Sequence, residues 1–222
     1  PSGLHDAEHY STAHDMALLT AAALQNETFR EICGQASAKV CFGNPPYERW
    51  LTNSNKLLTM DETVIGVKTG FTDEAGRCLV SASVRNGITL ICVTLNDRND
   101  WQDHEVLYDY GFGQLSPQEV TFPADWMLPV TGGTTGTAAV APAETLTVGV
   151  KDGNMPAWSY QLNTPPFLYA PLTAGQEAGT WKLLLDGRVA AQGRLLVQSA
   201  VTYQEKTTEP EPQSWWKRLL QK

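Results

Sequence analysis

Three consecutive residues after a short apolar run, Lys68, Thr69 and Gly70, have the chemistry to hold a substrate. They lie in the stretch 64–76, whose pattern predicts a short buried strand, a tight polar turn and the start of a second strand. A lysine ammonium suits a ligand that ends in a carboxylate, and a glycine lets a bound chain lie close beside the strand. The alternative is an exposed lysine and threonine at a strand end, because so short a motif also arises by chance.

Two histidines four residues apart, His5 and His9, form a second candidate site. On one helix this spacing would turn both imidazoles toward a zinc ion. A helix cap at Ser11 or Thr12 leaves both histidines in the loop before the helix. We therefore expect neither a metal site nor a cofactor.

The chain has four cysteines, Cys33, Cys41, Cys78 and Cys92. The dipeptide at 86–87 is Asn-Gly, a two-residue hairpin signal, and a hairpin centred there pairs Ser81 with Cys92. Cys78 then lies on the opposite face from Cys92, so we expect buried free thiols. A disulfide between Cys33 and Cys41 is the alternative.

Composition excludes some classes of function. The net charge is −8 with a pI near 5.0, which argues against a nucleic-acid binder because such proteins need a basic face. With 42% hydrophobic and 18% charged residues the chain can bury a core, and no apolar run approaches the ~20 residues of a membrane span. Because the sequence starts at Pro1 without a Met or a signal peptide, we expect a fragment or a processed product.

The elements expected around the candidate strand form an α/β domain over residues 1–114. Helices are predicted over about 12–25, capped at Thr12, and from Asn26 to Cys33, opened by Asn26 or Thr28 and ended by Gly34. A strand follows at 36–42. The hairpin at 86–87 has apolar residues on both faces, so we expect a central antiparallel sheet with helices on both sides. A further helix begins at 99 or 100 and ends at Gly111 in a left-handed conformation.

Beyond residue 114 the pattern changes. Residues 115–204 show short Val- and Thr-rich runs between prolines and glycines, and Asp186-Gly187 is a strong hairpin signal, which predicts a small all-β domain. Residues 205–222 read as a charged linker and a short amphipathic helix. Its apolar arc suits a membrane interface, with packing on the protein itself as the alternative. That arc consists of Trp215, Trp216, Leu219 and Leu220.

In order along the chain, the runs "PSGLHDAEHYSTAHDMALL", "LTNSNKLL", "VIGVKTGFTDEAGRCLVSASVRNGITLICVTL" and "VLYDYGFGQ" resemble the D-alanyl-D-alanine carboxypeptidases. These low-molecular-mass penicillin-binding proteins act on the bacterial cell wall. Lys-Thr-Gly is one of their three motifs, beside Ser-x-x-Lys and Ser-x-Asn. The resemblance implies the later part of their catalytic domain in residues 1–114, followed by their β domain and membrane anchor, and an extracytoplasmic location at the outer face of the cytoplasmic membrane.

The resemblance also implies roles for residues. Family members remove the terminal D-Ala of the peptidoglycan stem peptide through an acyl-enzyme, and β-lactams react at the same site. Lys68 would supply charge and assist proton transfer, Thr69 would bind the terminal carboxylate, and Gly70 would let the substrate backbone approach. The backbone N–H of Phe71 would be one of two oxyanion donors. Further residues that could contact the substrate are Thr72, Asn53 and Asn55.

Three departures from the family pattern matter. Some relatives carry His where this chain has Phe71, and some carry Arg where it has Ser54, so carboxylate binding rests more on Thr69 and Lys68. Residues 1–114 contain neither Ser-x-x-Lys nor Ser-x-Asn, because Ser37 and Ser54 have a lysine at the wrong spacing. We therefore expect this chain alone not to form an acyl-enzyme.

Two other functions stay open. A serine β-lactamase shares Lys-Thr-Gly, although the β domain and the anchor-like tail argue against it. A non-catalytic cell-wall binding or scaffold protein would account for the missing serine motif.

Overall fold

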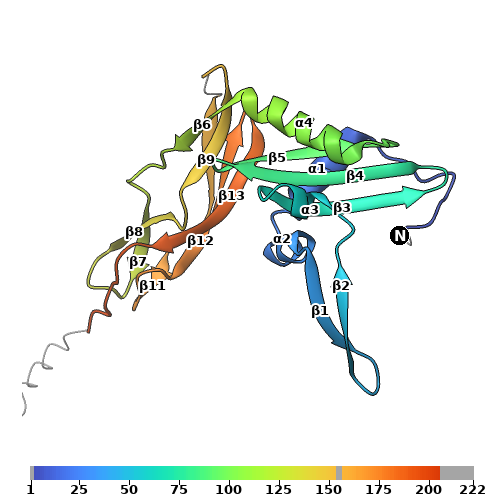
Figure 1. Cartoon of the computed structure of the whole chain (residues 1–222). Coiled ribbons are helices and arrows are strands. Elements are labelled where there is room, and N and C mark those ends of the chain that lie inside the picture. The colour runs from blue at the N-terminus through green and yellow to red at the C-terminus, as the bar shows by residue number, and fades with distance from the viewer. Residues whose placement is uncertain (1–2, 154–156, 206–222) are drawn as a thin grey trace, which may run out of the picture. The chain divides into compact units, whose positions relative to one another are not determined.

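The computed structural model describes residues 3–153 and 157–205 (Figure 1). The predicted tail helix with Trp215, Trp216, Leu219 and Leu220 lies outside the described residues. Contacts divide the chain into two compact units. The first comprises Pro1–Glu119 with Leu146–Met155, and the second comprises Val120–Thr145 with Pro156–Lys222.

The first unit is built on a three-stranded antiparallel sheet in the order β3-β4-β5 (Figure 1). The strands are β3 (Val64–Thr72), β4 (Gly76–Arg85) and β5 (Ile88–Thr94). Asn86 and Gly87 have φ angles of 51° and 78°, as a tight two-residue hairpin turn requires. Ser81 pairs with Cys92, so the register predicted from the hairpin signal is confirmed.

Helices cover both faces of this sheet, as expected for the α/β class. On one face, α3 (Leu57–Met60) and α4 (Asp100–Gly113) contribute to a core that contains Leu57, Leu79 and Tyr108. On the other face, α1 (Ala13–Ala23) and α2 (Glu27–Gly34) pack over a core that contains Val67, Val80 and Ala82. Because β4 is buried on both sides, it holds its neighbour β3 firmly in place.

Local sequence signals set both helix starts before the sheet. The Thr12 hydroxyl accepts a hydrogen bond from the Asp15 amide at 3.1 Å, which caps α1. The Asn26 side chain accepts one from the Phe29 amide at 3.0 Å, which caps α2. The predicted cap at Thr12 is confirmed, Asn26 rather than Thr28 caps α2, and α2 ends at Gly34 as expected.

The predicted end of α4 is wrong. The helix continues through Gly111 to Gly113, and Gly111 is not among the residues with positive φ. A Cβ added at Gly111 would lie 2.8 Å from Leu90 Cδ1. The glycine therefore serves the close approach of α4 to β5 rather than a helix stop.

The hairpin of β1 (Ser37–Phe42) and β2 (Tyr47–Thr52) extends from the rest of the first unit (Figure 1). The sequence pattern predicted only one of its two strands, β1, and not its partner β2. All residues of β2 are exposed, so neither face of this strand had to be apolar. Its sequence therefore does not show the alternation of apolar and polar residues by which a half-buried strand is predicted. The hairpin returns the chain to residues 53–55, just before α3.

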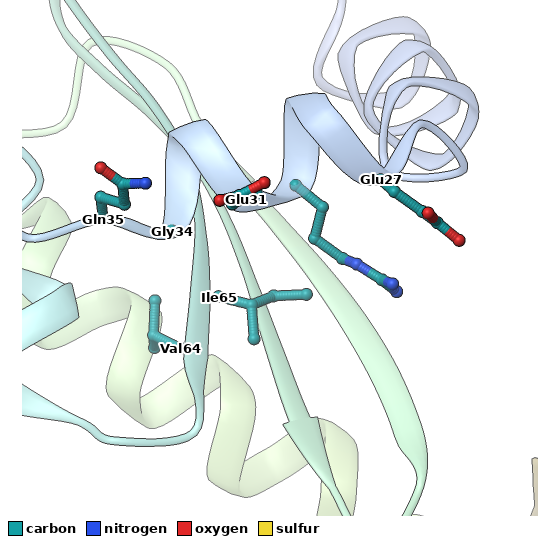
Figure 2. A pocket seen from close by; sticks show the side chains of 7 residues that line it. Glu27, Glu31, Gly34, Gln35, Val64 and Ile65 are labelled. Atoms are coloured by element: carbon teal, nitrogen blue, oxygen red, sulfur yellow. The ribbon is translucent and has the colours of Figure 1, made fainter.

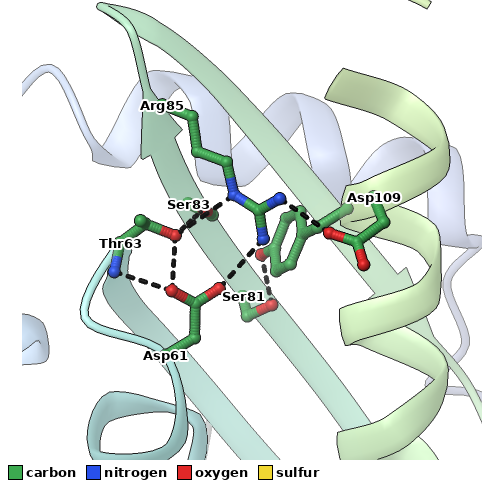
Figure 3. A network of polar contacts seen from close by, with 7 residues as sticks. Asp61, Thr63, Ser81, Ser83, Arg85 and Asp109 are labelled. Carbon is green, nitrogen blue, oxygen red and sulfur yellow. Dashed lines mark hydrogen bonds and ion pairs between the residues drawn. The ribbon is translucent and has the colours of Figure 1, made fainter. Parts of the chain in front are cut away.

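A polar network fixes the turn that leads into β3 (Figure 3). Asp61 accepts hydrogen bonds from the Thr63 amide at 2.8 Å and the Thr63 hydroxyl at 2.7 Å. Arg85 on β4 bonds to Asp61 at 3.1 Å and to Asp109 on α4 at 2.7 Å. Burial alone would raise the pKa of Asp61, but the hydrogen bonds from Thr63 and Arg85 outweigh it and lower that pKa.

The second unit is all-β in its described part. Its six-stranded sheet has the order β10-β12-β13-β8-β7-β11. Asp186 and Gly187, with φ of 47° and 76°, form the predicted hairpin turn between β12 and β13. The strands are β7 (Met127–Thr131), β8 (Thr137–Pro142), β10 (Trp158–Asn163), β11 (Leu168–Tyr169), β12 (Glu177–Leu185) and β13 (Arg188–Val197).

A separate two-stranded sheet joins β6 (Leu115–Val120) to β9 (Leu146–Lys151). Apart from Val120, both strands belong to the first unit by their contacts. The four cysteines are free, so the Cys33–Cys41 disulfide is not formed. The expected burial is confirmed for Cys92 alone, because Cys33 and Cys78 are half-buried and Cys41 is exposed. Within the described ranges, no helix is both long and apolar enough to cross a membrane.

Candidate active-site cleft

The strand that carries Lys68 and Thr69 borders a pocket in the first unit. This cavity has a volume of about 720 Å³. Its walls come from α1, α2, the segment before α3, and strands β3 and β4. The lining residues are Met16, Leu19, Thr20, Ala23, Phe29, Ile32, Cys33, Thr52, Asn53, Ser54, Val67, Lys68, Thr69 and Val80.

The pocket combines a mostly apolar wall with a short polar edge. Lys68 is the only charged residue among those that line it. Its side chain is exposed, and its ammonium donates a hydrogen bond to the Thr69 carbonyl. Burial raises the pKa of the Cys33 thiol, so this neighbour stays protonated at neutral pH. The pocket therefore presents one cation and several neutral donors to a ligand.

Thr69 has a partner from a distant part of the chain. Its hydroxyl lies 2.7 Å from the hydroxyl of Ser54, in the segment between β2 and α3. Sequence reasoning treated Ser54 only as a departure from a family pattern. Nothing in the local sequence signals the contact, because it depends on the path of the β1–β2 hairpin.

Asn53 and Asn55 hold the backbone around Ser54. The Asn53 amide donates to the carbonyls of Cys33 at 3.3 Å and Gln35 at 3.0 Å, and its oxygen accepts from the Asn55 amide N–H. The Asn55 oxygen accepts from the Leu57 N–H at 3.2 Å. Asn53 lines the pocket, whereas Asn55 is 2% exposed and is not among the lining residues. Within the described residues, the Asn55 side-chain nitrogen has no hydrogen-bond partner.

The remaining predicted site residues lie at the far end of β3. Gly70 and Phe71 are exposed, opposite Cys78 and Arg77 of β4. The Thr72 hydroxyl accepts a hydrogen bond from the Ala75 amide at 3.0 Å, which stabilises the β3–β4 turn. These three residues do not line the pocket. They continue β3 past Thr69, outside the pocket.

A second groove, of about 580 Å³, lies between α2 and the start of β3 (Figure 2). Its lining includes Glu27, Glu31, Gly34 and Ile65, with the charged side chains on α2. None of the predicted site residues lines it. The pocket beside Lys68 is therefore the better candidate for a site.

Three buried polar side chains form a cluster on the opposite face of the sheet, and the sequence did not predict it. The Ser81 hydroxyl lies 2.6 Å from His104 Nδ1 and 2.5 Å from the Tyr108 hydroxyl, and the three side chains are at most 1% exposed. Burial lowers the pKa of His104 to about 4 and raises that of Tyr108 above its ordinary value. A serine beside a histidine suggests a nucleophile, but the absence of solvent access makes this group structural.

The two N-terminal histidines do not form a cluster with other ligands. His5 Nδ1 lies 4.0 Å from a carboxylate oxygen of Glu74. Among the described residues, no group of three or more His, Cys, Asp or Glu side chains is arranged to hold a metal ion.

Residues 1–114 lack Ser-x-x-Lys, but the spacing does occur in the tail, at Ser214 and Lys217. Both lie outside the described residues. The tail follows the β domain, whereas the family motif would precede the Lys-Thr-Gly strand.

Comparison with known protein families gives a match over the first part of the chain. A family model described as D-alanyl-D-alanine carboxypeptidase matches residues 1–99. The chain is 28% identical over 200 residues to the D-alanyl-D-alanine carboxypeptidase DacF of Bacillus subtilis, covering 86% of this chain and 51% of the relative. It is 32% identical over 215 residues to DacC of Escherichia coli, covering 90% and 50%.

Among solved structures, the chain is similar to a peptidoglycan synthesis regulatory factor (PBP3) from Streptococcus pneumoniae. The TM-score is 0.60 at 20% identity, over 90% of this chain and 60% of that one. This likeness supports the fold. The chain spans about half the length of the curated relatives it matches.

Proposed function

We propose that this chain contributes the substrate-binding strand of a serine-type D-Ala-D-Ala carboxypeptidase. The match of residues 1–99 to the family model supports this proposal. The reaction removes the terminal D-alanine of a peptidoglycan stem peptide through an acyl-enzyme, and β-lactams acylate the same serine. One observation carries the proposal. The Lys68-Thr69 edge of β3 borders a pocket in which Lys68 is the only charged lining residue.

The roles follow from the chemistry of each group. The Lys68 ammonium attracts the substrate carboxylate and stabilises negative charge as the serine attacks. The Thr69 hydroxyl donates to that carboxylate. Because Gly70 has no side chain, the substrate backbone can lie antiparallel beside β3.

The Phe71 backbone N–H serves as an oxyanion donor, and such a donor contributes about 3 kcal/mol to the transition state in other acyl-transfer enzymes. Thr72 shapes the turn beyond it through its bond to Ala75. Asn53 and Asn55 act on the substrate through the backbone that they hold around Ser54. The reacting serine belongs on a Ser-x-x-Lys helix, which residues 1–114 do not contain.

The same proposal covers the rest of the chain. Residues 1–114 form part of the catalytic domain, residues 115–204 a β domain, and residues 205–222 a linker and anchor. The enzyme works in cell-wall metabolism outside the cytoplasmic membrane. It is held there peripherally through Trp215, Trp216, Leu219 and Leu220, which the helical period would place in one arc opposite basic residues.

The test is covalent labelling of the full-length gene product with a fluorescent penicillin. The wild type should label, and Lys68→Ala should lose at least 90% of the labelling rate because the only cation lining the pocket is removed. Lys39→Ala is the matched control, since Lys39 pairs with Glu48 on the β1–β2 hairpin at 2.7 Å.

Three outcomes decide the matter. Labelling lost only in Lys68→Ala supports the proposal. Equal labelling of wild type and Lys68→Ala contradicts the role of Lys68. A wild type that neither labels nor releases D-alanine favours the non-catalytic binding function.

A further inference from the structure

The polar edge of the pocket contains two hydroxyls that act as a pair. Ser54 and Thr69 are 15 residues apart in sequence, and their hydroxyl oxygens are 2.7 Å apart. A hydroxyl has one donor and two acceptor positions, so one O–H in the pair is used internally and the other remains available. The pair therefore offers a ligand one hydroxyl hydrogen whose direction is set by the partner.

The position of Ser54 is fixed by its neighbours rather than by its own side chain. Asn53 bonds to the carbonyls of residues 33 and 35 at the C-terminal end of α2, and Asn55 bonds to the start of α3. Residue 53 is also bound through its amide N–H to the Ala36 carbonyl at 2.8 Å. Ser54 is thus a short side chain on an anchored backbone, which makes its hydroxyl a precise partner for Thr69.

The pair carries no charge. Ser54 cannot form the charge-assisted, bidentate bond by which an arginine selects a carboxylate. Among the residues that line the pocket, only Lys68 is charged, and its ammonium already donates to the Thr69 carbonyl. One hydrogen bond leaves the ammonium its charge and its other donors, so Lys68 still attracts a carboxylate, whereas the other polar lining residues offer a ligand end only neutral hydrogen bonds.

We infer that Ser54 is a positioning and specificity-determining residue of the site. It orients the Thr69 hydroxyl toward the end of the substrate. Because Ser54 is neutral, Lys68 is the only lining charge that favours a free carboxylate, so the site prefers a free D-alanine end over its amide by less than about tenfold. This inference rests on the proposed function, because it names the substrate class of the same site. A cation introduced at position 54 converts the site to one that selects the free carboxylate.

The experiment uses the full-length gene product and two probes, an N-acylated Lys-D-Ala-D-Ala peptide and its C-terminal amide. Release of the terminal group gives kcat and KM for each. For the wild type, kcat/KM should differ less than tenfold between the two peptides. Ser54→Ala should lower kcat/KM about fivefold for both, chiefly through KM, and Ser54→Thr should restore it to within twofold because the hydroxyl returns.

Two further variants complete the test. Ser54→Arg should raise the preference for the free acid at least tenfold over wild type. Ser37→Ala, at an exposed serine on β1, should match the wild type on both peptides. Melting curves of the variants check that position 54 tolerates each change.

The outcomes separate this inference from the proposed function. An active wild type with an equally active Ser54→Ala overturns the inference alone, as does Ser54→Thr failing to rescue. A wild-type preference for the acid above a hundredfold overturns the neutral-end specificity. If the wild type neither releases D-alanine nor labels with penicillin, the proposed function and the inference fail together.

Discussion

Acid should destabilise the first unit through one buried histidine. His104 is 0% exposed, with Nδ1 2.6 Å from Ser81 and Nε2 3.0 Å from the Thr94 hydroxyl. Burial lowers its pKa from 6.5 to about 4, and the nearby carboxylates Asp100 and Asp97 only partly oppose this shift. The folded state therefore keeps His104 neutral while the unfolded state binds a proton.

The sign and the size follow from this difference. A lowered pKa in the folded state means that the stability contributed by neutral His104 is complete above pH 6.5 and is lost as the pH falls toward 4. At pH 5 the loss is about 2 kcal/mol relative to pH 7. With a urea dependence of about 2 kcal/mol per molar, the unfolding midpoint should fall by about 1 M.

The assay is urea unfolding of the chain at pH 7 and pH 5. Brief hydrogen-exchange labelling of peptides from β4 and α4 reports on the first unit separately from the second. His104→Gln should reduce the shift between the two pH values to below about 0.3 M, because the titrating group is gone. His14→Gln, at an exposed histidine of α1, is the matched control and should keep the full shift.

Each variant is compared with itself at the two pH values, so a pH-independent loss of stability caused by the substitution cancels. If His104→Gln loses as much stability as the wild type between pH 7 and pH 5, the reasoning is refuted. The same holds if the wild-type midpoint does not move.

Two predictions concern packing in the first unit. Leu57→Ala should cost about 2–5 kcal/mol of unfolding free energy, since Leu57 is 0% exposed in the core. Leu18→Ala, at a residue 58% exposed, should cost less than about 0.5 kcal/mol. Urea midpoints measure both losses, and equal losses would contradict the assigned core. Gly66→Ala should cost more than about 1 kcal/mol, because φ is +153° and the new Cβ would lie 2.7 Å from Cys33 Sγ. In the Cys33→Ala background the loss should be smaller but not zero, since the backbone strain remains; additive losses in a double-mutant cycle would argue against the clash.

Much of the first unit could be predicted from sequence because its signals are local. Asn86-Gly87 sets a two-residue turn, and the period of two then fixes the β4–β5 register and both buried faces. Thr12 and Asn26 cap helices within three residues of themselves. The candidate strand was likewise predicted from the local pattern of residues 64–76, a short apolar run followed by a polar turn.

Where local signals conflicted with packing, prediction failed. Gly111 looked like a helix stop, yet its lack of a side chain serves the contact of α4 with Leu90. Strand β2 carries no apolar alternation, because all its residues are exposed and only pairing with β1 holds it extended.

The residues of the cleft also fall into two groups, those that the sequence identified and those that only the tertiary structure brought together. The sequence alone determined that a lysine, a threonine and a glycine follow one another on a strand, and that residues 1–114 lack a Ser-x-x-Lys motif. Only the tertiary structure placed Ser54 at 2.7 Å from Thr69 and buried Ser81 against His104, 23 residues away. Such contacts depend on how the hairpin and the helices return the chain to the sheet, and side-chain periodicity carries no information about that path.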